Sequence, residues 1–158
     1  MDKKKALEEF TRSHAELLKS IEGLSEQQMT QEAVEGSWTI KDVLAHLTSW
    51  ENTLLAPLID YAQGDDFLPQ VIPDDLAWND QQAAEWQAKS LQTVFNELHE
   101  TRQAILNYLD KLDDAQWEIQ LPAPWRGHGT MADLISGLSW HEGEHLESIR
   151  KWLKKNKA

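Results

Sequence analysis

The sequence predicts an all-α protein, a four-helix bundle with an approximate internal two-fold repeat. Apolar residues recur at intervals of three and four in four separate stretches, which is the spacing of helices that bury one face. No stretch sustains the alternation of apolar and polar residues that a half-buried strand requires. Two similar segments, 36–44 and 127–135, lie 91 residues apart, so each half of the chain predicts one pair of helices.

Capping and terminating residues locate these helices. Thr39 and Asp42 form a T-x-x-D pair, whose side chains satisfy free backbone N–H groups at the start of a helix. The same pair recurs at Thr130 and Asp133, and Gly23 directly follows the first apolar stretch, as expected of a residue that ends a helix. The four helices are expected at about residues 3–22, 39–63, 81–111 and 130–155, within a single domain spanning 1–158.

A long acidic connection separates the second helix from the third. Residues 64–80 contain Pro69, Pro73 and several aspartates, and their length exceeds that of an ordinary turn between two helices. We expect this segment to form a crossover or a lid. In the third helix that follows, Arg102 interrupts an otherwise apolar stripe.

Composition excludes several classes of function. The 27 acidic and 15 basic residues give a formal net charge of −12, which repels phosphate backbones and anionic lipid, so neither nucleic acid nor a membrane is expected as a partner. The absence of cysteine excludes thiolate ligands and a cysteine nucleophile. No apolar run approaches 18 residues and the N-terminus lacks an apolar signal core, which predicts a cytoplasmic protein.

Two histidines on the last helix form the most informative functional pattern. His141 and His145 lie four residues apart, in line with the apolar residues of that helix. This spacing places both imidazoles on one helical face, the geometry with which a helix offers two nitrogens to one metal ion. The alternative is a pair of hydrogen-bonded core or surface histidines, but imidazoles on a buried stripe need partners. Gly143 between them favours close helix approach or access to a site.

A metal site needs a third ligand, which is expected upstream. The segment His141–His145 matches the H-E-x-x-H pattern of zincin proteases by letter, but those enzymes take their third ligand downstream, where this chain has no histidine. His46, beside the inward-facing residues of the second helix, ranks first. His14 completes the apolar stripe of the first helix and is the alternative, as a ligand or as a partner of one. His99 and His128 are expected on a solvated face and in a loop.

Tryptophan is abundant for a chain of this length. Three of the eight tryptophans, Trp50, Trp86 and Trp140, are candidates for the wall of a substrate pocket. The alternative is that they fill the core, because aromatic residues at helical spacing are more often buried there.

Two stretches carry a family resemblance. The segment Gly36–Leu47, with Trp140–His145 far downstream, resembles the DinB/YfiT-like superfamily of four-helix bundles over nearly the whole chain. Residues 38–51 and 78–80 are most similar to the ClbS/DfsB-like branch. The resemblance implies a divalent metal, typically zinc or nickel, held by three histidines that match His46, His141 and His145.

The resemblance also implies a class of activity. Relatives include thiol-dependent S-transferases that use bacillithiol, mycothiol or glutathione, and a maleylpyruvate isomerase. We therefore expect a metal-dependent S-transferase or hydrolase that acts on a small electrophilic molecule, with a low-molecular-weight thiol as a candidate partner. The alternative is a non-catalytic protein that sequesters such a molecule or confers stress resistance, as in the ClbS/DfsB branch. Relatives commonly form dimers, so a homodimer is expected.

Overall fold

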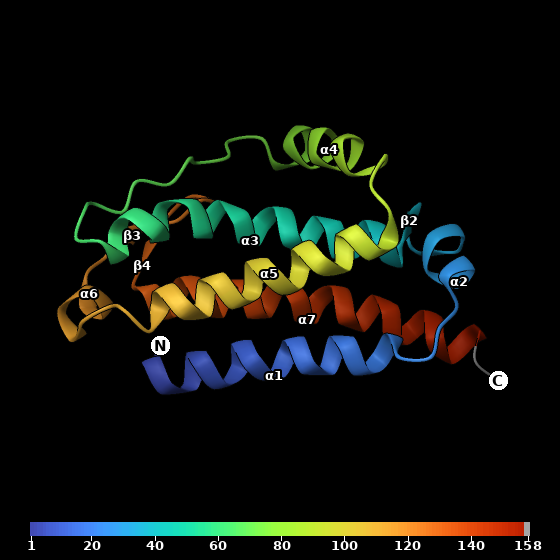
Figure 1. Cartoon of the computed structure of the whole chain (residues 1–158), viewed down its shortest axis with the longest axis horizontal. Coiled ribbons are helices and arrows are strands. Elements are labelled where there is room, and N and C mark those ends of the chain that lie inside the picture. The colour runs from blue at the N-terminus through green and yellow to red at the C-terminus, as the bar shows by residue number, and fades with distance from the viewer. Residues whose placement is uncertain (157–158) are drawn as a thin grey trace.

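The computed structural model describes residues 1–156 as a helical bundle with two short hairpins (Figure 1). The all-α class predicted from the sequence is confirmed. Four long helices form the body of the protein, and three shorter helices connect or flank them. The elements in chain order are α1 (Lys3–Ile21), α2 (Glu26–Gln31), β1 (Ala33–Glu35), β2 (Trp38–Thr39), α3 (Ile40–Ala62), α4 (Asp75–Trp86), α5 (Leu91–Leu109), α6 (Asp114–Glu118), β3 (Leu121–Pro122), β4 (His128–Gly129) and α7 (Met131–Asn156).

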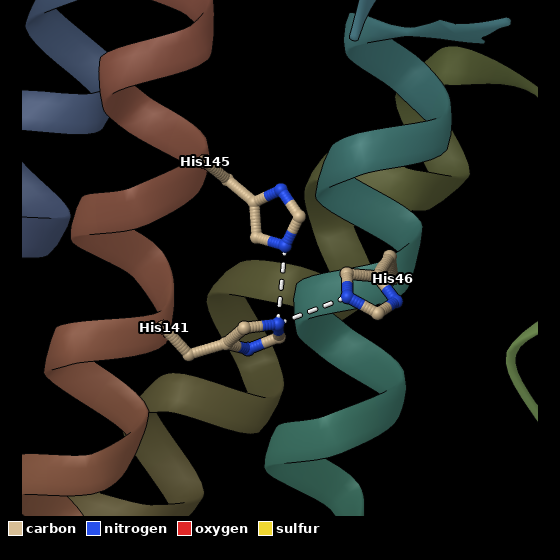
Figure 2. A group of neighbouring side chains, drawn as sticks. All are labelled: His46, His141 and His145. Atoms are coloured by element: carbon tan, nitrogen blue, oxygen red, sulfur yellow. Dashed lines mark hydrogen bonds between the residues drawn. The ribbon is translucent and has the colours of Figure 1, made fainter. Parts of the chain in front are cut away.

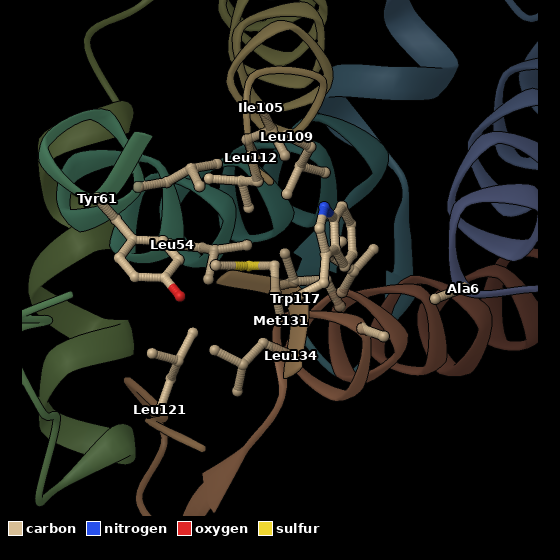
Figure 3. Packing of buried hydrophobic residues seen from close by; sticks show 14 of the residues in the cluster. Ala6, Leu54, Tyr61, Ile105, Leu109, Leu112, Trp117, Leu121, Met131 and Leu134 are labelled. Atoms are coloured by element: carbon tan, nitrogen blue, oxygen red, sulfur yellow. The ribbon is translucent and has the colours of Figure 1, made fainter. Parts of the chain in front are cut away.

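The long helices pack as two neighbouring pairs. Helix α1 lies along α7, α5 lies along α3, and α3 also contacts α7 (Figure 1). Two apolar clusters fill the interior, and in one of them Leu54 and Met131 pack near Trp117 (Figure 3). On α3, α5 and α7 the residues of the two clusters are separated along the helix by buried polar residues. The bundle therefore has a polar layer between two apolar ones.

The internal repeat predicted from the sequence is present in the order of the elements. Each half runs from a long helix through a one-turn or two-turn helix and an antiparallel hairpin into a second long helix. The helix starts match in detail. The amide N–H of Asp42 donates to Oγ1 of Thr39 over 3.2 Å, and that of Asp133 donates to Oγ1 of Thr130 over the same distance. The duplicated T-x-x-D pairs thus set the start of α3 and of α7.

The sequence-based prediction differs from the structure in two places. The hairpins β1–β2 and β3–β4 were not expected, because strands of two or three residues are too short to show an alternating pattern. The single helix predicted over 81–111 is wrong, since α4 ends at Trp86 and α5 begins at Leu91. Ser90 caps the new helix by accepting from the amide of Thr93.

The acidic connection between α3 and α4 is fastened to the bundle. Phe67 and Ile72 within it are buried, and the amide of Ile72 donates to the carbonyl oxygen of Pro124 over 2.8 Å. Asp74 then caps α4, which lies along the outer side of α3 (Figure 1). The connection therefore joins the loop of the β3–β4 hairpin, through Ile72, to the start of α4. Among the described residues, no helix combines the length and apolarity needed to cross a membrane.

Candidate metal centre

Three histidine side chains from two helices meet inside the bundle. His46 comes from α3, and His141 and His145 come from successive turns of α7 (Figure 2). The Nε2 atom of His141 lies 3.0 Å from Nε2 of His46 and 3.1 Å from Nε2 of His145. One ligand atom from each ring lies within 4.8 Å of the others. The structure therefore brings together the three histidines that the sequence singled out.

The cluster is poised to offer lone pairs. Burial, with His141 and His145 adding to it, lowers the pKa of His46 to about 3. Burial and the neighbouring His145 lower the pKa of His141 to about 4, against a raising effect of Glu142. Both imidazoles are consequently neutral at pH 7. A neutral imidazole is the form that binds a metal ion.

Glu35 in β1 fixes the third ring. Its carboxylate oxygens lie 2.9 and 3.0 Å from Nδ1 of His145, so Nδ1–H donates to the carboxylate and Nε2 is the ring nitrogen that faces His141. Trp38 in β2 packs against the ring of His46, with the ring centroids 4.7 Å apart. The first hairpin thus supports two of the three histidines. The sequence carried no signal for either contact. Glu35 and His145 are 110 residues apart, and Trp38 lies in a short strand before the helix that carries His46.

The donor set fits a divalent cation. Nε2 of His141 has two short contacts, to Nε2 of His46 and to Nε2 of His145. One hydrogen on Nε2 of His141 cannot form two well-aligned hydrogen bonds to both of these atoms. A cation, by contrast, accepts a lone pair from each of the three rings. Ligand nitrogens bound at about 2.0–2.1 Å to a tetrahedral zinc ion lie roughly 3.4 Å apart. The two separations from Nε2 of His141, 3.0 and 3.1 Å, are close to that value.

A buried ionic network ties α3 and α7, the two helices that carry the histidines, to α5. The guanidinium of Arg102 donates to Oε2 of Glu142 over 2.8 Å and to the carbonyl oxygen of Phe10 over 2.8 Å. Its Nε also contacts Oε1 of Glu51, although without hydrogen-bond alignment. Glu142 directly follows His141 on α7, and Glu51 lies five residues after His46 on α3. Arg102 therefore contacts both histidine-bearing helices, α3 and α7.

The two carboxyls of this network have opposite pKa shifts. Burial, reinforced by Glu142, raises the pKa of Glu51 to about 7 against the attraction of Arg102. Burial also acts to raise the pKa of Glu142, but His14, Arg102 and Ser13 outweigh it and hold that pKa below its usual value. Glu142 accepts from the hydroxyl of Ser13 and lies 3.4 Å from Nδ1 of His14.

The positions of Glu142 and His14 bear on two interpretations of the sequence, the zincin pattern and His14 as a third ligand. The carboxylate of Glu142 is engaged in the polar layer of the core, which disfavours the zincin pattern, where this glutamate would be the general base. His14 contacts Glu142 and no member of the histidine cluster. Arg102, read from the sequence only as an interruption of a stripe, is the centre of the network.

A cavity of about 340 Å³ opens beside the cluster, and His46 and His141 form part of its wall. Helices α3 and α7 supply one side of the cavity, while α4, the connection before it and the β3–β4 hairpin supply the rest. The other lining residues are Trp50, Ile72, Asp75, Asn79, Trp125, Arg126, Gly137, Leu138 and Trp140.

The candidate pocket tryptophans divide between cavity and core. Trp50 and Trp140 line the cavity, and Trp140 is 68% exposed at its edge. Trp86 does not line it, because its ring is buried in the apolar core and its Nε1 donates to Ser49. Trp125, which the sequence did not single out, lines the cavity through the second hairpin.

The two glycines of α7 have different surroundings. A Cβ at Gly137 would lie 2.8 Å from the indole of Trp125, so this glycine makes room for a cavity wall. The expectation that Gly143 allows close helix approach is wrong, because a Cβ there would meet nothing within 4 Å.

A helical bundle whose core brings three imidazoles together, two of them at the wall of a cavity, belongs to the class of bundles suited to a metal centre. The chain is a member of the DinB superfamily, whose family model matches residues 9–149. No curated protein matches the chain.

Solved structures with the same fold include proteins of several kinds. YfiT from Bacillus subtilis, a probable metal-dependent hydrolase with an unusual four-helix bundle topology, superposes with a TM-score of 0.73 at 17% identity, covering 99% of this chain and 90% of that one. The mycothiol-dependent maleylpyruvate isomerase gives a TM-score of 0.78 at 10% identity, over 94% of this chain and 61% of that one. Colibactin self-resistance protein ClbS, in complex with a dsDNA, gives 0.75 at 13% identity, over 96% and 95%.

The exclusion of nucleic acid as a partner, drawn from composition, is wrong. It depends on the formal net charge of −12, which is a property of the whole chain. ClbS has the same fold and was crystallised with dsDNA. Net charge does not determine where basic side chains gather on a surface, so it cannot exclude a nucleic-acid partner.

Proposed function

We propose that the chain is a divalent-metal-dependent enzyme that activates a water molecule or a thiol for attack on a small electrophilic molecule. His46, His141 and His145 would hold the metal. The reaction would be hydrolysis when water is the nucleophile and S-transfer when a low-molecular-weight thiol is the nucleophile.

One observation carries this proposal: the three Nε2 atoms converge at the edge of a cavity. His46 and His141 line that cavity, while His145 is held from behind by Glu35. A cation bound by these rings would have protein on one side and the cavity on the other. Three protein ligands with an open position are the arrangement of catalytic zinc sites, whereas structural sites are closed by four protein ligands.

The chain's own residues would orient and enclose the reactants. Glu35 keeps the lone pair of His145 directed at the cluster, and Arg102 keeps α3 and α7 at a fixed separation. Trp50, Trp125 and Trp140 give the cavity apolar walls that exclude water around a bound molecule. A divalent cation, when bound, supplies Lewis acidity that lowers the pKa of a water or thiol toward neutrality.

Zinc or nickel is the metal that we propose. Three imidazole nitrogens suit zinc, nickel, copper and iron better than the oxygen-preferring magnesium or calcium. The family resemblance of the sequence, which implies zinc or nickel, favours the first two.

Elemental analysis and a turnover assay test the proposal. Protein purified without a metal-affinity tag should contain about one divalent metal per chain. After chelation it should keep its far-UV circular dichroism and lose turnover, and zinc or nickel should restore turnover. Substrates would be a bimane electrophile with bacillithiol, mycothiol or glutathione, and an activated ester without thiol. A thiol requirement would identify transfer, and turnover without thiol would identify hydrolysis.

The outcomes separate the proposal from its alternative. If His46→Ala, His141→Ala and His145→Ala bind metal as tightly as the parent, the assignment of the ligands is wrong. If the parent binds the electrophile reversibly and no combination shows metal-dependent turnover, the chain is a sequestering or resistance protein instead of an enzyme.

A further inference from the structure

The cavity beside the histidine cluster carries hydrogen-bond donors that no protein group uses. We propose that it binds its small-molecule ligand through an anionic group, such as a carboxylate, held by Arg126 and Asn79. Because this ligand is the substrate of the proposed function, the inference rests on that function and specifies the chemical class of the molecule.

Asn79 presents its amide N–H₂ group without a protein partner. Its side-chain oxygen Oδ1 accepts from Nε1 of Trp50 over 3.0 Å. An indole nitrogen can only donate, so this bond fixes which end of the amide faces Trp50 and leaves the N–H₂ end free. No hydrogen bond from that end to any residue within 1–156 is present. Asn79 thus offers two donors at the cavity wall.

Arg126 provides a cation at the same cavity. Among residues 1–156 its guanidinium takes part in no ion pair, although the chain carries an excess of acidic residues. Its backbone has φ 78°, in the left-handed region that favours glycine, and two hydrogen bonds within 123–127 hold this turn in place. Residues other than glycine in this conformation cluster at active sites and ligand-binding positions.

The remaining lining residues are compatible with an anionic ligand that has an apolar body. Trp50, Trp125 and Trp140 supply flat apolar walls. Asp75 is the one carboxylate of the lining, and it lies in the first turn of α4, one turn before Asn79. The positive end of the helix dipole offsets its charge there, and no ion pair joins it to Arg126. A cavity of about 340 Å³ accommodates a molecule the size of one or two rings.

Matched pairs of acids and amides test the anionic group directly. Isothermal titration of the purified full chain would use benzoate and benzamide, indole-3-acetate and indole-3-acetamide, and cinnamate and cinnamamide. The two members of each pair have nearly the same shape and differ in charge. The parent should bind at least one acid ten or more times as tightly as its amide. Arg126→Gln should reduce that preference to threefold or less.

Two further variants locate the effect. Asn79→Asp keeps an oxygen for Trp50 and replaces the free donors with a carboxylate oxygen, so acid affinity should fall at least tenfold while amide affinity changes less. Arg12→Gln removes an arginine that is 67% exposed on α1 and pairs with Glu16, so it alters net charge equally and should leave the preference intact. If no pair shows a preference for the acid, or if Arg126→Gln keeps it, the proposal is wrong.

A carboxylate could also bind at a metal held by the three histidines. Elemental analysis would show whether the parent and Arg126→Gln contain the same amount of metal. If they do, the metal contributes equally to acid binding in both proteins. The difference between their acid-over-amide preferences then measures the effect of Arg126. The titration needs neither metal nor turnover. If the titration shows no preference for acids, the results on metal binding and turnover still hold. If the protein shows no metal binding or turnover, the titration still tests the anion site.

Discussion

Replacing Arg102 with methionine removes the centre of the buried ionic network and keeps an unbranched side chain in its place. The change leaves the carboxylate of Glu142 and the carboxyl of Glu51 without their cation, and both side chains are almost fully buried. Loss of one partner from a buried ion pair costs about 3–5 kcal/mol, because the remaining charge stays uncompensated. For a chain of this size the melting temperature should fall by roughly 6–20 °C.

The cost should depend on pH with a defined sign. Removing the Arg102 cation raises the pKa values of both carboxyls in the folded variant above their values in the folded parent. The folded variant then binds more protons than the folded parent over the pH range of this shift, so the loss of stability grows as pH rises. The difference between Arg102→Met and the parent should accordingly be larger at pH 8 than at pH 5.

Urea denaturation followed by far-UV circular dichroism measures these differences. The control is Arg12→Met, which removes an exposed arginine whose contact with Glu16 is 4.0 Å long, and it should cost less than about 0.5 kcal/mol. Adding Glu142→Gln to Arg102→Met removes one uncompensated charge and should restore at least about 1 kcal/mol at pH 8.

Two results would refute the reasoning. One is a loss of less than about 1 kcal/mol in Arg102→Met at pH 8, which would mean that the carboxyls find other partners or water. The other is a further loss of stability when Glu142→Gln is added, which would mean that the glutamate stabilises the fold through its other contacts alone.

Three further changes have expected outcomes. Because the pKa of Glu51 is raised to about 7, mainly by burial, the parent loses stability as pH rises from about 4.5 to 7, so Glu51→Gln should gain about 3 kcal/mol relative to the parent across that range in urea denaturation. Glu35→Gln should weaken zinc affinity about 10–100-fold in competition with a chelator, and the exposed Glu32→Gln should leave it unchanged. In thermal unfolding, Gly143→Ala should stabilise the helix by about 0.5–1 kcal/mol, and Gly137→Ala should destabilise the protein by about 1–3 kcal/mol.

Each of these expectations has a contrary result. Equal pH dependence of Glu51→Gln and the parent would show that the carboxyl is ionised in the folded protein throughout. Equal zinc affinity of the two glutamate variants would show that the contact to His145 has no effect on the ligand. The same sign for both glycine variants would show that the indole beside Gly137 moves aside without cost.

Signals between neighbouring residues in the sequence were sufficient to predict the helical bundle and the histidine cluster. The pair Thr39 and Asp42 marks a helix start by chemistry that involves only neighbouring residues, and the structure contains the predicted bonds. His141 and His145 share a face because helical periodicity fixes their direction. His46 could be ranked first because it lies beside inward-facing residues of its own helix.

The remaining parts of the site depend on contacts between distant segments. Glu35 meets His145 across 110 residues, and Arg102 meets Glu142 across 40, so neither pairing has a signature at short range. The break between α4 and α5 was missed because the residues around Ser90 are good helix formers in a polar stretch, and only its capping bond reveals the new start. Arg126 lies in a hairpin too short to be recognised from its pattern.

The repeat has a consequence for how the centre is built. At the offset that relates the two halves, His46 corresponds to Gly137, and His141 corresponds to Trp50. Gly137 and Trp50 both line the cavity. Two more imidazoles at these positions would fill space that a bound small molecule needs. The two halves share a backbone arrangement but carry different side chains at matching positions. The histidine cluster is therefore enclosed by protein on one side and open to the cavity on the other.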